Sequence, residues 1–195
     1  MIVIIEGPRG AGKSHLVNKF FSQNLKDDYV YYKWDFAEWV KELEIDESKQ
    51  GCHYFSVGNI ITILELADTI FKDKILVLDR SLISAYVWAM YRNRMERKTL
   101  EEEFSKIMSK IYKNCFLIYV NRDASVSEFN RSTKDIFDKY ENYMQESLVF
   151  EECISISSSV LTDSSIGNSM VYFNNKFDLS SELEFNKLLY SLSNK

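Results

Sequence analysis

The chain has 195 residues, of which 46% are hydrophobic and 27% are charged, so it suits one domain with a sizeable core. Its net charge of -5 gives no general attraction to polyanions, and no uncharged apolar window is long enough to span a bilayer. Three widely spaced cysteines without a metal-binding pattern, and an apolar start too short for a signal sequence, predict a cytoplasmic protein without membrane contact.

Short apolar runs alternate along the chain with stretches of helical periodicity, which is the pattern of a parallel sheet flanked by helices. In chain order we predict a strand over 1–6, a helix over 15–25, a strand over 29–36, a helix over 55–72 and a strand over 74–81. A helical region over 82–112 with a break near Lys98, a strand over 115–123, a helix over 124–150, a strand over 170–175 and a last helix follow. The last helix opens with Ser181 and Glu184 in capping-box spacing, and the aperiodic, serine-rich stretch 155–169 favours a surface loop. This order predicts a single α/β domain over 1–195, with about five parallel strands between helical layers.

Residues 7–14 read Gly-Pro-Arg-Gly-Ala-Gly-Lys-Ser and match the phosphate-loop pattern, with a buried strand before them and a helix after them. In such a loop the backbone N–H groups wrap a phosphate chain, in conformations with positive φ that glycine adopts readily. A glycine-rich turn without a ligand is the alternative. The motif predicts that Lys13 contacts the β- and γ-phosphates of ATP, that Ser14 binds Mg²⁺, and that the remaining loop residues surround the phosphates: Gly7, Pro8, Arg9, Gly10, Ala11 and Gly12.

Asp79 and Arg80 follow a buried strand, which places them at the carboxyl edge of the sheet, where open parallel sheets bind ligands. A carboxylate at this edge can bind Mg²⁺ or its waters across from Ser14. A guanidinium can bind phosphate oxygens and stabilise the charge that develops during phosphoryl transfer. An ion pair that only closes the end of the strand is the alternative.

Together these two stretches resemble the superfamily of thymidylate kinases and deoxynucleoside kinases. The Glu-Gly pair at 6–7 is similar to thymidylate kinases, and Gly-Ala-Gly-Lys-Ser at 10–14 is similar to deoxynucleoside kinases. The triplet at 79–81 combines features of both groups, and Ser84 and Tyr86 fit the thymidylate kinase pattern in part. The resemblance implies the three-layer fold of P-loop nucleoside monophosphate kinases, ATP with Mg²⁺ as the donor, and contact between Arg80 and the acceptor.

The resemblance also implies roles for residues that match by position rather than by motif. Asp35 ends the second strand, where an acid of deoxynucleoside kinases removes a proton from the sugar hydroxyl; a surface aspartate is the alternative. Arg131, ahead of Arg122 and Lys134, is the candidate catalytic arginine of a lid over 122–145, where a solvated helix face is the alternative. The Arg-Pro pair that thymidylate kinases carry in or near the helix that reads the base is absent, so the candidates for an acceptor pocket are His53, Tyr54, Phe55 and Asn59. A core position for Phe55 and a loop position for His53 are the alternatives.

Three functions are compatible with these residues. The first is a kinase that transfers the γ-phosphoryl group of ATP to a deoxypyrimidine nucleoside or its monophosphate, with homodimer formation, common in thymidylate kinases, left open. The second resembles the bacteriophage kinases of 5-hydroxymethyluracil in DNA; the missing Arg-Pro pair, the sparse lid and the basic stretch 91–98 favour it, whereas the acidic net charge opposes it. An exposed helix end is the alternative for that stretch. The third is a non-catalytic nucleotide-binding module, which the intact Lys13, Ser14 and Asp79 oppose.

Overall fold

Five parallel strands lie at the centre of the fold, in the spatial order β2-β3-β1-β4-β5. They are β1 (Ile2–Glu6), β2 (Tyr29–Lys33), β3 (Ile75–Asp79), β4 (Cys115–Arg122) and β5 (Met170–Asn175). This computed structural model describes residues 1–23, 28–34, 41–46, 49–111, 115–122, 140–162 and 170–193. Because β1 lies between β3 and β4, the carboxyl ends of these three strands lie side by side near the middle of one sheet edge.

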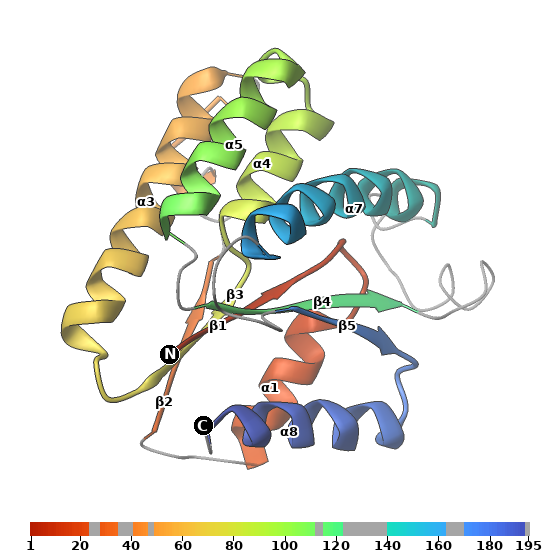
Figure 1. The fold of residues 1–195 in the computed structure, drawn as a ribbon. Coiled ribbons are helices and arrows are strands. Elements are labelled where there is room, and N and C mark those ends of the chain that lie inside the picture. Colours follow the sequence, from red (N-terminus) through yellow and green to blue (C-terminus); the bar gives the residue numbers. More distant parts are fainter. Residues whose placement is uncertain are drawn as a thin grey trace.

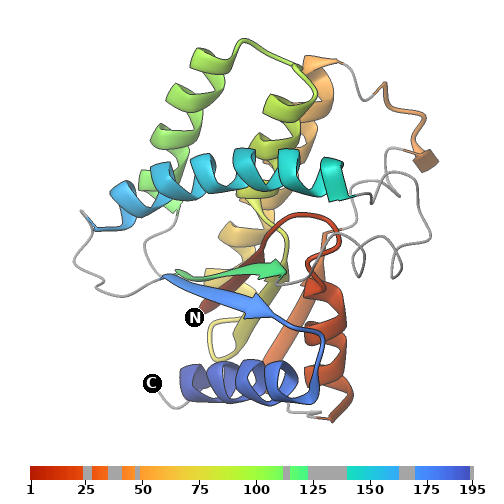
Figure 2. The ribbon, with the colours of Figure 1, turned by 90° about the vertical axis from the view of Figure 1, so that its right-hand side faces the viewer.

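Helices cover both faces of the sheet. On one side lie α1 (Lys13–Gln23) and α8 (Leu179–Ser193), and on the other lie α3 (Gln50–Ile70), α4 (Leu82–Tyr91), α5 (Arg97–Ile111) and α7 (Tyr140–Thr162) (Figure 1). The view turned by 90° shows the same separation, with α8 below the sheet and α7 above it (Figure 2). The expected three-layer α/β architecture with a parallel sheet is confirmed.

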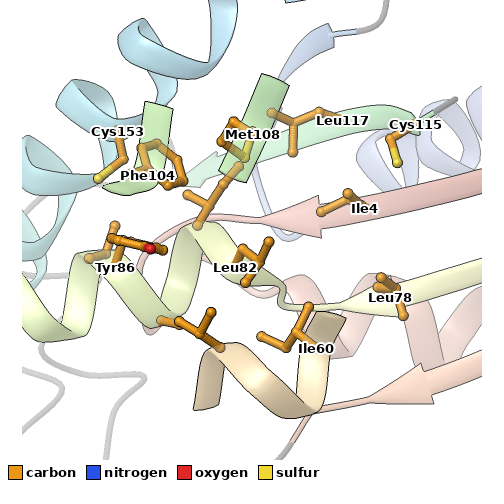
Figure 3. Packing of buried hydrophobic residues seen from close by; sticks show 14 of the residues in the cluster. Ile4, Ile60, Leu78, Leu82, Tyr86, Phe104, Met108, Cys115, Leu117 and Cys153 are labelled. Carbon is orange, nitrogen blue, oxygen red and sulfur yellow. The ribbon is translucent and has the colours of Figure 1, made fainter. Parts of the chain in front are cut away.

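The strands build two separate cores because their side chains alternate between the faces of the sheet. Ile4 of β1 packs toward α3, α4, α5 and α7, whereas Val3 and Ile5 pack against α1 and α8. Figure 3 shows the first core, which extends from Ile4, Leu78 and Leu117 on the strands to Tyr86 and Phe104 on the helices. Every residue of β1 and of β3 is buried, as is typical of parallel strands that are covered on both faces.

The helical region predicted over 82–112 is interrupted at residues 92–96, earlier than expected. Asn93 has a φ of 49°, and the backbone N–H groups of Asn93 and Arg94 donate to carbonyls in the last turn of α4. This is the Schellman arrangement that ends a helix, and asparagine tolerates its left-handed conformation. The break is therefore made by Asn93 and not near Lys98.

The serine-rich loop predicted over 155–169 is wrong for its first half, because α7 continues to Thr162. Residues 163–169 lie outside the described part of the chain. Packing explains the difference, since helical spacing brings apolar residues of α7 into the core, where their burial outweighs the weak helix propensity of serine. These residues are Phe150, Cys153 and Ile154.

The last helix begins at Leu179, two residues before its predicted start. Asp178 caps it, because its Oδ1 accepts a hydrogen bond from the Ser181 N–H at 2.7 Å. Ser181 does not cap the helix as predicted with Glu184; its hydroxyl instead accepts from the Lys176 N–H at 3.1 Å.

Two candidate catalytic residues, Asp35 and Arg131, lie outside the described residues, as do residues 123–139 of the expected lid. Within the described ranges, no helix is both long and apolar enough to cross a bilayer. The three cysteines are buried and carry free thiols.

Candidate active site

The glycine-rich loop between β1 and α1 has the backbone that its sequence predicts. Gly7, Gly10 and Gly12 have φ angles of 143°, 81° and 84°, a region that residues with a Cβ rarely adopt. A Cβ on Gly7 would lie 2.1 Å from the Val120 carbonyl oxygen, and one on Gly12 would lie 2.4 Å from Asn175 Nδ2. Glycine is therefore required by the neighbouring strands as well as by the loop conformation.

Backbone N–H groups of this loop are available to a ligand. Among the described residues, the amides of Gly10, Gly12, Lys13 and Ser14 donate to no acceptor, and the Ser14 amide lies in the first turn of α1. Successive free amides at a helix N-terminus form a concave site for an anion, which the helix dipole reinforces. The loop can thus surround a phosphate chain without rearranging its hydrogen bonds.

Lys13 is folded into the loop and is only 4% exposed. Its Nζ donates to the carbonyl oxygens of Gly7 at 2.7 Å and Pro8 at 2.8 Å. Burial, and next the Arg80 guanidinium, lowers the pKa of Lys13 to about 7. A bound phosphate would give the Lys13 ammonium a negatively charged partner and would raise its pKa again.

Ser14 and Asp79 lie side by side, as their places in the sequence predict. The Ser14 hydroxyl donates to Asp79 Oδ2 at 2.8 Å, and the Tyr31 hydroxyl donates to the same oxygen at 3.2 Å. Asp79 Oδ1 is buried, and no described residue donates a hydrogen bond to it. Two hard oxygen ligands, one of them unsatisfied, suit a small divalent cation. Mg²⁺ is a cation of this kind, because it is bound by few protein oxygens and completes its coordination with waters or phosphate oxygens.

Arg80 has a φ of 82°, which is unusual for a residue with a side chain. Its N–H donates to the Ile5 carbonyl at 3.0 Å, so the chain turns sharply at the end of β3. Its Nη1 donates to the Ser84 hydroxyl at 3.1 Å, and its other guanidinium nitrogens donate to no described residue. Strained backbone at a sheet edge often accompanies a functional site, and here it aims a largely unengaged cation at the loop.

Glu6 connects the end of β1 to the start of α4 and was not among the predicted site residues. Its carboxylate is fully buried and accepts from the N–H and hydroxyl of Ser81, at 2.6 and 2.7 Å, and from those of Ser84, at 3.2 and 2.6 Å. Since Ser84 also accepts from Arg80, this network orients the guanidinium. The Glu-Gly pair before the loop was the signal in the sequence, but nothing in the sequence identified its partners.

Arg9 was predicted as a loop residue, and the structure adds two partners to it. Glu146 of α7, which is 2% exposed, accepts from the Arg9 N–H at 2.9 Å and from its Nε at 3.4 Å. The Arg9 guanidinium carbon also lies 4.4 Å from the centre of the Trp88 ring, a cation–π distance. Neither partner could be found from the sequence, because 137 residues separate Arg9 from Glu146.

The ends of β4 and β5 close the other side of the loop. Arg122 Nη1 donates to the Gly10 carbonyl at 3.4 Å, and its guanidinium carbon lies 4.5 Å from the centre of the exposed Phe177 ring. Asn175 is buried, and its Nδ2 donates to the Ala11 carbonyl at 2.9 Å. Arg122, a candidate lid arginine, thus lies at the loop, and Phe177 was not predicted at all.

In the described part of the chain, the candidates for an acceptor pocket on α3 do not point toward one another. His53 is fully buried against Tyr86 at a ring distance of 4.7 Å, and burial lowers its pKa to about 4. Tyr54 is exposed and donates to Glu103, whereas Asn59 donates to the carbonyl of Phe55 in its own helix. Helical geometry explains the failure, since consecutive residues point in different directions.

The basic stretch 91–98 is divided between the core and the surface. Arg94 is buried and adds to the effect of desolvation in lowering the pKa of His53, whereas Arg97 forms surface ion pairs with Glu101, at 3.0 Å, and with Glu152. The Arg92 guanidinium carbon lies 5.4 Å from the centre of the Trp88 ring. Arg94 and Arg97 therefore have partners within the fold, which leaves less of the stretch for a DNA backbone.

Comparison with known proteins agrees with this architecture. The chain is similar over 100% of its length to a thymidylate kinase from Candida albicans, with a TM-score of 0.60, 14% identity and 93% of that chain covered. It is also similar over its whole length to a deoxyadenosine kinase from M. mycoides, solved with dCMP and dCDP bound. The TM-score is 0.54, the identity is 14%, and 100% of both chains is covered. It also matches the NadR protein in complex with NR, with a TM-score of 0.58 and 13% identity, but spans only 52% of that chain.

No protein-family model matches the chain, and no curated protein matches it in sequence. At 13–14% identity the structural likeness establishes the fold, which the chain shares with the thymidylate kinase, the deoxyadenosine kinase and NadR. The fold implied by the two sequence motifs is thereby confirmed.

Proposed function

We propose that this protein is a kinase that uses ATP and Mg²⁺ to phosphorylate a pyrimidine nucleoside or its monophosphate. The observation that carries the proposal is that donors of three kinds gather at one loop: backbone amides without an acceptor among the described residues, the Lys13 ammonium, which donates only to loop carbonyls, and the Arg80 guanidinium, of which one nitrogen is engaged. The likeness in fold to a thymidylate kinase and a deoxyadenosine kinase supports a nucleoside or nucleotide as the acceptor.

The residues of the loop would bind the triphosphate of ATP. The free amides would donate to phosphate oxygens, and Lys13 would turn its Nζ from the carbonyls of Gly7 and Pro8 to the γ-phosphate. Negative charge on the phosphates raises the pKa of Lys13, so the side chain is a full cation when the donor is bound.

Ser14 and Asp79 would hold Mg²⁺, which supplies neutralisation of the charge on the phosphate oxygens. Arg80 would bind the acceptor and stabilise the charge that spreads over the transferring group, with its position set by Ser84 and, through Ser84, by Glu6. Asp35 as the base for a sugar hydroxyl and Arg131 as the lid arginine remain part of the proposal.

The surface beside the loop suits the base of the nucleotide. The ring of Phe177 and the guanidinium of Arg122 lie next to the loop backbone, and planar groups of this kind stack on a nucleobase. We therefore assign the base of ATP to the Phe177 side, which leaves the Arg80 side for the acceptor.

The test is phosphoryl transfer from labelled ATP to thymidine, thymidylate and DNA that contains 5-hydroxymethyluracil, each offered separately. The proposal expects label in thymidine or thymidylate, and loss of this label in Lys13→Ala. The matched control is Lys19→Ala on the same helix, where the lysine only pairs with Glu182 at 3.8 Å at the surface. Label in DNA alone would refute a free nucleoside or monophosphate as the acceptor. Full transfer by Lys13→Ala would refute the mechanism.

A further inference from the structure

Arg9 occupies the third position of the phosphate loop and is held in place on three sides. Its backbone N–H and its Nε both donate to the buried Glu146 carboxylate, and Trp88 lies under its guanidinium. Its two terminal nitrogens donate to no described residue. Because Nε is fixed by Glu146 while the two terminal nitrogens have no acceptor among the described residues, the guanidinium is available to bind an anionic ligand.

The tip of Arg9 lies on the same side of the molecule as Arg80. Ser84 and Trp88 are four residues apart in α4, which places them on one face of that helix, and Arg80 lies just before the helix. Arg80 contacts Ser84, and Arg9 lies over Trp88, so the two guanidinium groups line the same face. Arg80 and Glu146 both affect the pKa of Lys13, the first lowering it and the second raising it, so both lie close to the phosphate loop.

Two fixed guanidinium groups indicate the charge of the acceptor. A neutral nucleoside offers hydroxyl groups, for which one arginine suffices, whereas a phosphate offers several oxygens and a negative charge that two arginines can bind in forked geometry. Arg122 lies at the Gly10 carbonyl and beside the Phe177 ring, whereas Arg9 lies against Glu146 and over Trp88, so a base stacked on Phe177 does not account for the fixed position of Arg9.

We propose that Arg9, together with Arg80, binds a phosphate group of the acceptor, so that the preferred acceptor is a nucleoside monophosphate. Glu146 and Trp88 are positioning residues, because they hold the guanidinium without contact to the acceptor. This inference rests on the proposed kinase function and decides between the two acceptor classes that the proposed function leaves open.

Calorimetric titration of the intact chain tests the inference without turnover. Thymidine, thymidylate and a short DNA strand containing 5-hydroxymethyluracil are each titrated in the presence of Mg²⁺ and an unreactive ATP analogue. We expect thymidylate to bind at least about tenfold tighter than thymidine, and Arg9→Gln to weaken thymidylate about 10- to 100-fold, since it removes charge-assisted hydrogen bonds. Arg9→Gln leaves the affinities for thymidine and for the ATP analogue unchanged. Arg97→Gln, which removes an equal charge from a surface ion pair, is the matched control.

Arg9→Gln also leaves a buried carboxylate with a single donor, which can destabilise the fold. The double variant Arg9→Gln, Glu146→Gln removes that charge and must show the same selective loss of thymidylate.

The DNA strand could also bind more tightly than thymidine and lose this advantage in the Arg9 variants. That result would support the contact between Arg9 and a phosphate, and would show that the phosphate belongs to a polymer. Binding of the ATP analogue with no preference for either phosphorylated acceptor, or a loss in Arg9→Gln that falls on the ATP analogue, would overturn this inference alone. Absence of any binding by the ATP analogue would refute the proposed function, and the inference with it.

Discussion

Replacement of Glu6 by glutamine is the most direct test of how the site is held together. The carboxylate accepts four hydrogen bonds inside the protein, and its Oε1 alone accepts three of them. Glutamine has the same shape, but its amide nitrogen cannot accept from the Ser84 hydroxyl, and its oxygen carries no full charge. The buried hydroxyl of Ser84, which also accepts from Arg80, then faces a second donor.

The magnitude follows from the difference between charged and neutral acceptors. Hydrogen bonds to a charged group contribute about 1.5–3 kcal/mol, against about 0.5–1.5 kcal/mol for neutral ones, so the three weakened bonds and the lost fourth bond cost about 5 kcal/mol. Loss of the negative charge at the N-terminus of α4 adds up to about 1 kcal/mol, and relief from burying a charge offsets part of the sum. We expect a net loss of about 3 kcal/mol, or a Tm lower by about 6–12 °C for a chain of this size.

Urea and thermal unfolding of Glu6→Gln measure this loss. The control is Glu182→Gln, which removes a surface carboxylate paired with His15 at 3.1 Å and Lys19 at 3.8 Å, and should change the stability by less than about 1 kcal/mol. A Glu6→Gln protein as stable as this control would show that the buried network does not depend on a charged carboxylate, and the account of how Arg80 is oriented would have to be abandoned.

Four further outcomes are expected. Gly7→Ala loses about 2–5 kcal/mol in urea unfolding because its Cβ would lie 2.1 Å from a β4 carbonyl oxygen, whereas Gly51→Ala, in open space, should not destabilise the fold. Asp79→Asn weakens ATP binding at least about tenfold with Mg²⁺ but not with EDTA, and equal losses in calorimetry would argue against a metal ligand. Because burial lowers the pKa of Lys13 to about 7 and phosphate raises it again, ATP binding takes up a proton above that pH. Affinity then falls about fivefold from pH 7 to pH 8, and pH-independent binding would contradict this. Phe177→Ala weakens the binding of ATP about tenfold but leaves the binding of inorganic tripolyphosphate unaffected. Equal losses for both ligands would refute the assignment of the base to the Phe177 side.

The parts of the site that follow directly from the sequence are those built by neighbouring residues. The loop conformation depends on Gly7, Gly10 and Gly12, and the buried run before it had to be a strand, so the geometry of the loop could be predicted from residues 1–14. Asp79 could be placed beside Ser14 because strands of a parallel sheet share one carboxyl edge.

The tertiary structure decided which distant residues support that loop. Glu146 reaches Arg9 only because α7 crosses the sheet beside α4, and Phe177 reaches Arg122 only because β5 pairs with β4. His53 shows the opposite case, since a residue that suited a pocket by type is buried against Tyr86 by the packing of α3 on α4. Local sequence determines backbone conformation and strand ends, whereas contacts between residues more than a hundred positions apart depend on strand order and helix packing, which no short motif specifies.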